Sequence, residues 1–317
     1  MASNRKSRRD GRSKAGIMIV AGVAAIAVAG VAVYIFSGDD DGTPTEAERL
    51  IGADAVLQQA ALQSAKSGDS PGVSIAQYES MGSDIRKTLS GKQGQERYGA
   101  LVGGYRRMAA ELEKPLPTGV REKLLPLFHE LTGELFFSNI RNEFSIEYVV
   151  KPGDSIGEIA KRFKVTEELL CDWNNLDWNQ RHKIRANQSF KIVKGEPRLV
   201  VDKSDFCLSF YFGDNLARQF IVAHGRGNNT PEGVSKVNGK TVDPDKAPYA
   251  GAQQQEMAER WIGFAAFGSR TGIGIHGTKY EESIPGETSL GCIRMFNRDV
   301  VELYRWVPHG AVIEIKA

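Results

Sequence analysis

The sequence predicts a multi-domain protein: an N-terminal transmembrane helix, an α-helical spacer, a small βααβ module and a mainly-β domain. Three observations support this order. A run of 22 residues near the start carries no charge, the stretch after it repeats apolar side chains at helical spacing, and the last third alternates short apolar runs with turn residues. With 317 residues, the chain is long enough for two or three domains.

The N-terminal charges predict how the chain meets a membrane. Basic residues crowd positions 1–14, a cytoplasmic arm, and positions 15–36 are uncharged and long enough to span a bilayer. Three aspartates follow at 39–41. Positive charge before the span predicts a single-pass protein of the cytoplasmic membrane, with the N-terminus inside and the rest outside. The formal net charge of +2 argues against nucleic acid as a partner.

A cleaved signal peptide is the alternative to this membrane anchor. Its apolar core is usually about 7–15 residues long and ends in a small-x-small site. Here the run is longer and closes on the bulky residues Val33-Tyr34-Ile35-Phe36. The anchor is therefore favoured, and a helix buried in a globular core is disfavoured by so basic an arm.

Residues 45–142 are predicted to form a helical spacer domain. Apolar side chains recur there at intervals near 3.6 residues, and Gly and Pro clusters break the pattern. The helices after the first break are expected at about 73–90, 95–113 and 119–138. His129 lies beside Phe128 on an amphipathic pattern, which favours a packed histidine over a metal ligand. Nothing in the stretch indicates its partner.

Residues 147–194 form the predicted βααβ module. Short apolar runs at each end read as strands, Ser155 and Glu158 form a capping box that opens the first helix, and Thr166 can cap the second. The apolar core is small and self-contained, and Gly195-Glu196-Pro197 is expected to be a linker.

This module resembles LysM. The resemblance rests on Tyr148-x-Val150-x-x-Gly153-Asp154-Ser155-x-x-x-Ile159-Ala160, followed by Val165, Leu169 and Asn174. The loop 177–183 is longer and more polar than usual, and Asn187-Gln188 stands where the family favours Gly-Gln. The resemblance implies binding of glycan strands such as peptidoglycan, mainly through Gly153, Asp154 and Ser155. The alternative is a degenerate LysM that only packs against its neighbours.

Residues 198–316 show a β pattern that suggests a sandwich or barrel-like domain. Strands are expected at 199–201, 206–212, 218–223, 261–267, 271–275 and 311–315. The polar residues 238–258 are expected to form a long loop, and Asn297 is placed to cap a helix over 298–306.

One histidine and one cysteine in this domain point to nucleophilic catalysis. His276 and Cys292 lie 16 positions apart, each beside a glycine. A thiol attacks as a thiolate, and an imidazole can take its proton. The N–H groups of Gly291 and Cys292 are candidates to hold an oxyanion, and Arg294 offers a fixed fork for a carboxylate.

The domain resembles the L,D-transpeptidase (YkuD) catalytic domain. The resemblance is carried by Thr230-Pro231-x-Gly233, Ile275-His276-Gly277-Thr278, and Ser289-x-Gly291-Cys292-Ile293-Arg294-Met295 with Asn297 and Asp299. The family pattern usually reads Ser-His-Gly-Cys, and Leu290 replaces that histidine here.

The resemblance implies that peptidoglycan stem peptides are the substrate. His276, oriented by a backbone carbonyl near Gly277, would activate Cys292, which would form a thioester and pass the acyl group to an amine of another stem. Arg294 would hold a stem carboxylate or brace the cleft, and Ser289 would orient the loop. No cofactor and no metal are expected.

Two other functions stay open at this point. Water could resolve the thioester, which would make the protein an L,D-carboxypeptidase. Alternatively, the protein could be a non-catalytic wall anchor. The match of Gly272-Ile-Gly274-Ile-His-Gly277 to G-x-G-x-x-G is discounted, because no βαβ unit follows it. Cys171 and Cys207 read as buried apolar residues rather than as a disulfide.

Overall fold

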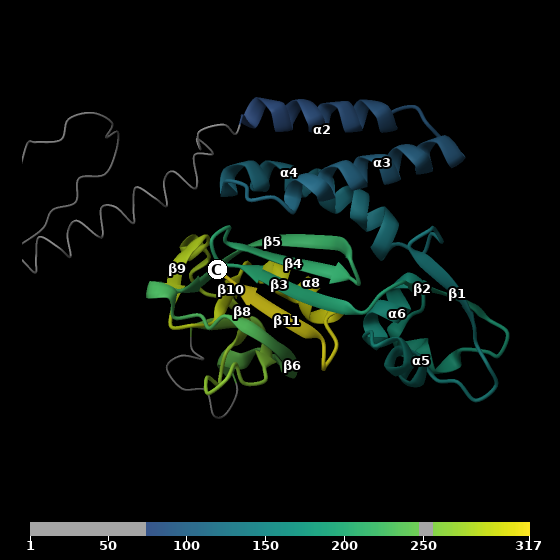
Figure 1. Cartoon of the computed structure of the whole chain (residues 1–317). Helices are drawn as coiled ribbons and strands as arrows, with labels where there is room; N and C mark the ends of the chain where they lie inside the picture. Colours follow the sequence, from purple (N-terminus) through teal and green to yellow (C-terminus); the bar gives the residue numbers. More distant parts are fainter. Residues whose placement is uncertain (1–73, 247–255) are drawn as a thin grey trace, which may run out of the picture. The chain divides into compact units, whose positions relative to one another are not determined.

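The computed structural model describes residues 74–246 and 256–317, all within the compact unit Val56–Ala317 (Figure 1). The predicted basic arm and transmembrane run at 1–36 lie outside these residues. Across the described part of the chain, none of the helices combines the length and the apolar character that crossing a bilayer requires.

The helical region forms the three helices expected after the first break, and the expected helical stretch before that break lies outside the described residues. The three helices are α2 (Ile75–Leu89), α3 (Gly94–Leu112) and α4 (Thr118–Thr132), and α4 continues into a π-helical turn, η1 (Gly133–Phe137). Pro126 lies inside α4. His129 is packed against the ring of Phe220, and its Nε2 lies 2.9 Å from the Gln219 carbonyl oxygen, so it is a core histidine.

This region covers the mainly-β domain directly. The guanidinium of Arg121 is buried and donates to the Leu112 carbonyl at 2.8 Å and to Asp205 of the β domain at 2.5 Å. Its Nη1 also donates to Gln219. Buried charges are tolerated when they are paired and hydrogen-bonded in this way. The helical region is therefore packed against the β domain and is more than a spacer.

The LysM-like module has the predicted βααβ order. Its two strands pair antiparallel, with Tyr148 opposite Phe190, and Ser155 and Glu158 form the expected capping box. Thr166 Oγ1 accepts from the Leu169 N–H at the start of the second helix. The elements are β1 (Ser145–Val149), α5 (Ile156–Phe163), α6 (Glu167–Trp173), the 3-10 turn η2 (Trp178–Lys183) and β2 (Ser189–Val193).

The module is not self-contained, which corrects the expectation from the sequence. Trp173 is fully buried, donates from Nε1 to the Phe136 carbonyl at 2.7 Å and packs on Phe212 of the β domain. Arg305 of the β domain pairs with both oxygens of Asp172, at 2.9 and 2.8 Å. The module therefore shares its core with the helical region and with the β domain.

The mainly-β domain is a sheet that closes on itself. Its strands follow the order β10-β8-β7-β6-β11-β3-β4-β5-β9, and β10 also pairs with β5, which completes a barrel-like ring. Helix α8 (Asn297–Trp306) packs on β7 and β8. The strands are β3 (Pro197–Asp202), β4 (Cys207–Phe212), β5 (Asn215–Gly225), β6 (Gly233–Val242), β7 (Met257–Phe264), β8 (Gly274–Thr278), β9 (Gly286–Ser289), β10 (Ile293–Met295) and β11 (Val312–Lys316).

Two local expectations are wrong. A long loop was expected at 238–258, but 238–242 belong to β6, which pairs antiparallel with both β7 and β11, and 257–258 belong to β7. Residues 247–255 lie outside the described part of the chain. Asn297 does not cap a helix from 298. It is the first residue of α8, and its amide instead bonds the backbone of Thr278, accepting from the N–H and donating to the carbonyl, both at 3.0 Å.

Candidate active site

The parallel pairing of β8 with β10 brings the predicted base and nucleophile together. Arg294 lies opposite His276, and Ile293 lies opposite Ile275. Cys292 immediately precedes β10 (Ile293–Met295), so it lies at the end of the strand that pairs with β8. The same register, extended by one residue, sets Cys292 beside Gly274. The two catalytic candidates therefore lie on, or directly before, adjacent strands and are two residues out of register.

Gly274 allows β7 and β8 to pack closely beside His276. A Cβ on Gly274 would lie 2.6 Å from the ring of Trp261 and 2.5 Å from the Ile262 carbonyl oxygen. Trp261 in turn lies opposite His276 in the β7–β8 pair, with the two ring centroids 5.9 Å apart. Gly274 therefore serves close packing around the histidine. This packing accounts for the glycine without a dinucleotide-binding site.

The ring of His276 is oriented by the backbone of the next residue. Its Nδ1 lies 2.6 Å from the Gly277 carbonyl oxygen. A carbonyl can only accept, so Nδ1 carries the proton and Nε2 of the neutral ring keeps a free lone pair. Burial lowers the pKa of His276 to about 4, against the raising effect of the Gly277 bond, and the Arg294 charge lowers it further. The ring is neutral near pH 7 and can act as a base.

Cys292 differs from the other two cysteines in its exposure. Cys171 and Cys207 are free, buried thiols, whereas Cys292 is free and half-buried. Burial raises the pKa of the Cys292 thiol, while a backbone hydrogen bond from Gly274 and the Arg294 charge act in the opposite direction. The thiol donates to the Gly272 carbonyl at 3.7 Å. It therefore rests as a protonated thiol.

Ser289 shapes the loop that carries the cysteine. Its hydroxyl donates to the Cys292 carbonyl at 2.6 Å and accepts from the Gly291 N–H at 3.0 Å. The expectation that the Gly291 N–H is free for an oxyanion is therefore wrong for this state, because the serine already occupies it. The N–H of Cys292 stays the candidate oxyanion donor.

Thr230, from the Thr-Pro-x-Gly stretch, fastens the same loop from the other side. Its buried hydroxyl accepts from the Gly225 N–H at 2.7 Å and donates to the Gly291 carbonyl at 2.9 Å. Gly291 has φ +140°, a conformation that side chains rarely adopt. The sequence contained Thr230 in a motif but gave no sign of its partner, because 61 residues separate it from Gly291.

Leu290 and Arg294 flank the loop in different ways. Leu290, at the position of the family histidine, is 62% exposed. Arg294 is 8% exposed, and its Nη2 pairs with Glu256 at 2.8 Å while its Nη1 lies 3.4 Å from Ser283 Oγ. Its Nε has no hydrogen-bond partner among the described residues. With Glu256 already bound, Arg294 braces the site in this state.

Two of the three residues predicted to contact glycan line a surface hollow of about 590 Å³. Gly153 and Asp154 belong to it, together with Lys161 and Arg162. Asp154 accepts from the Tyr148 hydroxyl at 2.6 Å, which lowers the pKa of its carboxyl. Ser155 is committed to capping α5.

No group of three or more His, Cys, Asp or Glu side chains within 74–246 and 256–317 could hold a metal ion. Cys292 and His276 offer groups that acyl transfer through a thiol uses: a nucleophile and a neutral imidazole base, with the Cys292 N–H as candidate oxyanion donor.

Two families match the sequence. The YkuD family, described as the L,D-transpeptidase catalytic domain, matches residues 196–315. The LysM domain matches residues 148–193, directly before it.

Two bacterial relatives have names that assign them to L,D-transpeptidases. YqjB of Bacillus subtilis is 36% identical over 39% of this chain and 73% of its own length. YkuD of Bacillus licheniformis is 33% identical over 53% of this chain and 97% of its own length. The second match is long enough to include the LysM-like module together with the β domain.

Solved structures of L,D-transpeptidases are more distant. The enzyme from Mycobacterium smegmatis is 17% identical, covers 41% of this chain and 64% of its own, and has a TM-score of 0.31. The one from Xylanimonas cellulosilytica is 19% identical, covers 39% and 61%, and has a TM-score of 0.32.

Proposed function

Because the chain belongs to the YkuD family of L,D-transpeptidases, we propose that it cross-links peptidoglycan stem peptides through a thioester on Cys292. The single observation that carries this is the His276 ring. The Gly277 carbonyl fixes its tautomer, and β8, which carries the ring, pairs with the strand that Cys292 directly precedes. An inert buried thiol would need neither.

The reaction proceeds in two half-steps. Nε2 of His276 takes the Cys292 proton as the sulfur attacks the carbonyl of the third stem residue. The Cys292 N–H stabilises the oxyanion. The imidazolium then gives its proton to the nitrogen of the leaving D-alanine, and a thioester remains. An amine of a second stem attacks this thioester while His276 takes the amine proton. The thiolate leaves and recovers the proton, so no cofactor is consumed.

Proton transfer accompanies attack in this scheme. Burial raises the thiol pKa and lowers the imidazole pKa, so a standing thiolate–imidazolium pair is disfavoured in the free protein. His276 therefore acts as a general base during attack, a contribution typically worth about 10²–10⁴-fold in rate.

Hydrolysis at the same site is the second candidate. Leu290, which stands where the family has a histidine and is exposed, removes one polar contact beside the nucleophile. Acceptor choice depends on the shape of the cleft, so a water acceptor would make the protein an L,D-carboxypeptidase.

The test is mass spectrometry of the full chain, solubilised in detergent, after incubation with tetrapeptide muropeptides. A dimer linked between two third residues supports the transpeptidase, and a bare tripeptide supports the carboxypeptidase. Cys292→Ala should abolish the acyl-enzyme adduct with a carbapenem, and Cys207→Ala, which removes a buried thiol, should not. Cross-linking by the Cys292→Ala protein would show that Cys292 is not the nucleophile. If the unaltered chain forms neither the dimer nor the tripeptide, the protein is a non-catalytic anchor.

The location proposed for this activity is the outer side of the cytoplasmic membrane. The support is the sequence pattern of basic residues at 1–14 followed by the uncharged run at 15–36. The LysM-like module, with Gly153 and Asp154 in a surface hollow, is proposed to hold the glycan strand whose stems are processed.

A further inference from the structure

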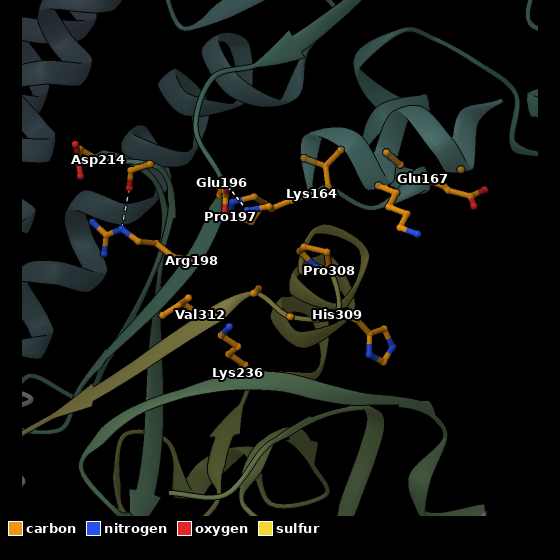
Figure 2. Close-up of a pocket in the computed structure, with 17 residues that line it drawn as sticks. Lys164, Glu167, Glu196, Pro197, Arg198, Asp214, Lys236, Pro308, His309 and Val312 are labelled. Carbon is orange, nitrogen blue, oxygen red and sulfur yellow. Dashed lines mark hydrogen bonds and ion pairs between the residues drawn. The ribbon is translucent and has the colours of Figure 1, made fainter. Parts of the chain in front are cut away.

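A cleft of about 910 Å³ lies where the LysM-like module faces the mainly-β domain. Figure 2 shows Lys164 and Glu167 on the module side and Lys236, Pro308 and His309 on the β-domain side. The volume falls in the range typical of small-ligand sites, about 300–1,000 Å³, and such sites favour domain boundaries. Neither Cys292 nor His276 lines it, so it is separate from the active site.

The cleft carries uncompensated positive charge. Lys164 is neutralised by Glu196 at 2.5 Å, and Glu167 by Arg181, which lies outside the cleft, at 3.3 Å. Within the described part of the chain, Lys161 and Lys236 have neither an ion-pair nor a hydrogen-bond partner.

The two remaining charged residues of the lining, Arg198 and Asp214, do not change this excess of positive charge. Arg198 donates from Nε to the Gly213 carbonyl at 2.8 Å and keeps its charge, while Asp214 is the one remaining acidic residue. Lys161 comes from the module and Lys236 from β6, so the two domains each contribute one free ammonium to the cleft. An anionic ligand would be held by both domains at once.

The cleft adjoins the proposed glycan hollow, because Lys161 lines both. A strand held at Gly153 would therefore lead toward the two free ammonium groups. Along a peptidoglycan strand, the repeating anionic groups are the carboxylates of the peptide stems.

We propose that this cleft binds a carboxylate-bearing peptide stem of the strand held by the module, a stem other than the one acylated at Cys292. This rests on the proposed function. A single exposed ion pair changes affinity by only about 2- to 5-fold. A stem and a glycan held together on one strand reinforce each other, because the second contact forms at high effective concentration.

The experiment compares two charge-reversed forms of the full chain in detergent. Lys236→Glu alters the cleft and leaves the residues of the glycan hollow untouched, and Lys87→Glu makes the same charge change on an exposed helical position. The dissociation constant is measured by calorimetry for muropeptide oligomers with free stem carboxylates, for the same oligomers with amidated carboxylates, and for a neutral N-acetylglucosamine oligomer.

We expect the cleft variant to bind the free-carboxylate oligomer about 5-fold more weakly than the control variant, since one ion pair is lost and the charge is reversed. Both variants should bind the neutral oligomer equally, and the unaltered chain should prefer the free carboxylates to the amidated ones. Equal constants for the two variants would overturn the proposal. So would inorganic polyphosphate that competes better than the muropeptide, because the cleft would then be a phosphate site.

Carbapenem acylation of Cys292, measured on the same preparations, distinguishes failure of the cleft proposal from failure of the proposed function. Normal acylation with unchanged muropeptide binding would overturn the cleft alone. Absence of both acylation and muropeptide binding in the unaltered chain would overturn the proposed function and the cleft with it.

Discussion

The charge state of the candidate pair, His276 and Cys292, depends on the Gly277 carbonyl, on the Arg294 side chain and on burial. The Gly277 carbonyl holds the proton on Nδ1 of His276, and Arg294 faces both groups. Arg294 favours the thiolate but disfavours the imidazolium, and burial opposes both charged forms. The neutral pair is therefore favoured at rest, and in the proposed reaction the charges develop as the sulfur attacks.

This balance predicts two different pH profiles. Alkylation of Cys292 by iodoacetamide reports the thiolate alone, so its rate should rise about 10-fold per pH unit between roughly 6 and 8, without a plateau. Acylation by a carbapenem, which uses the neutral pair, should stay nearly flat over that interval. It should decline only as falling pH protonates His276, whose pKa is about 4.

The control for this profile is His276→Ala. It should slow acylation by about 10²-fold or more and leave the pH dependence of alkylation unchanged in form. A flat alkylation rate between pH 6 and 8 in the unaltered chain would instead reveal a standing ion pair and contradict the neutral resting state.

Thr230 is expected to matter for the position of the nucleophile although it is far from it in sequence. Thr230→Val keeps the shape but loses the bonds to Gly225 and Gly291, which frees the turn before Cys292. Misplacement by about 1 Å can cost up to about 10² in rate. Carbapenem acylation, followed by intact mass, should slow by about 10- to 100-fold.

Serine at the same position provides the matched control. Thr230→Ser retains the hydroxyl and should restore most of the acylation rate, whereas both variants should keep a melting temperature close to that of the unaltered chain. If valine and serine slow acylation equally, the methyl packing is responsible and the hydroxyl is not.

The residues of the site differ in how far the sequence revealed them. His276, Cys292 and Ser289 lie within 17 positions of one another and form a readable pattern. Thr230 and Glu256 act on that pattern through contacts that only the closed sheet creates. The commitment of the Gly291 N–H to Ser289 is likewise a property of the folded loop, which the residue types alone left open.

At the scale of elements, the LysM-like module is joined to the helical region by side-chain hydrogen bonds as well as by the connecting backbone. Lys191 of β2 is buried, and its ammonium donates to the carbonyls of Leu135 at 3.2 Å and Ser138 at 2.8 Å. A cation favours the C-terminal end of a helix, where carbonyls lack partners. Deleting 147–194 would remove this ammonium and Trp173 together, and would expose the core that they cover.

Trp173→Ala should therefore destabilise the whole described unit. Loss of a fully buried tryptophan typically costs about 3–5 kcal/mol, and denaturant unfolding of the full chain should show a lower midpoint in a single transition. Carbapenem labelling of Cys292 should be lost at the same denaturant concentration.

Trp178→Ala is the matched control, because Trp178 is 41% exposed on η2 and should change stability by less than about 0.5 kcal/mol. A Trp173→Ala protein that unfolds in two separate steps, with Cys292 labelling unaffected by the first, would show that the module is independent after all.

Strand prediction succeeded where apolar residues dominate and failed where pairing alone makes the strand. The six residues of β4 are all buried and were readable as a strand. β6 alternates small, polar and charged residues, and half of it was taken for a loop. It is ordered by antiparallel partners on both sides, β7 and β11, which a local pattern does not contain.

At the scale of the molecule, the buried apolar residues of the helical region, the module and the β domain form one contiguous cluster. The sequence suggested three bodies joined by linkers, because each has its own periodicity. Apolar faces such as that of Phe136, Phe137 and Trp306 meet only after folding, with 4.2 Å between the last two ring centroids. A peptide-processing site built on such a unit is held at a fixed position relative to the module that is proposed to hold glycan.

Residues 1–36, which precede this unit, are predicted to anchor the chain in the cytoplasmic membrane. A Lys or Arg at the centre of a spanning helix costs about 2.5–3.5 kcal/mol on insertion scales, so an uncharged run of 22 residues after a basic arm favours insertion with the arm inside. Protease added to spheroplasts should then digest the Cys292 domain and leave a small membrane-bound N-terminal fragment, detected with an N-terminal tag. Full protection of the domain would overturn the topology, and the access to peptidoglycan with it. Recovery of a soluble, fully active form that begins near Ser37 would instead establish the cleaved signal peptide and leave the enzyme assignment intact.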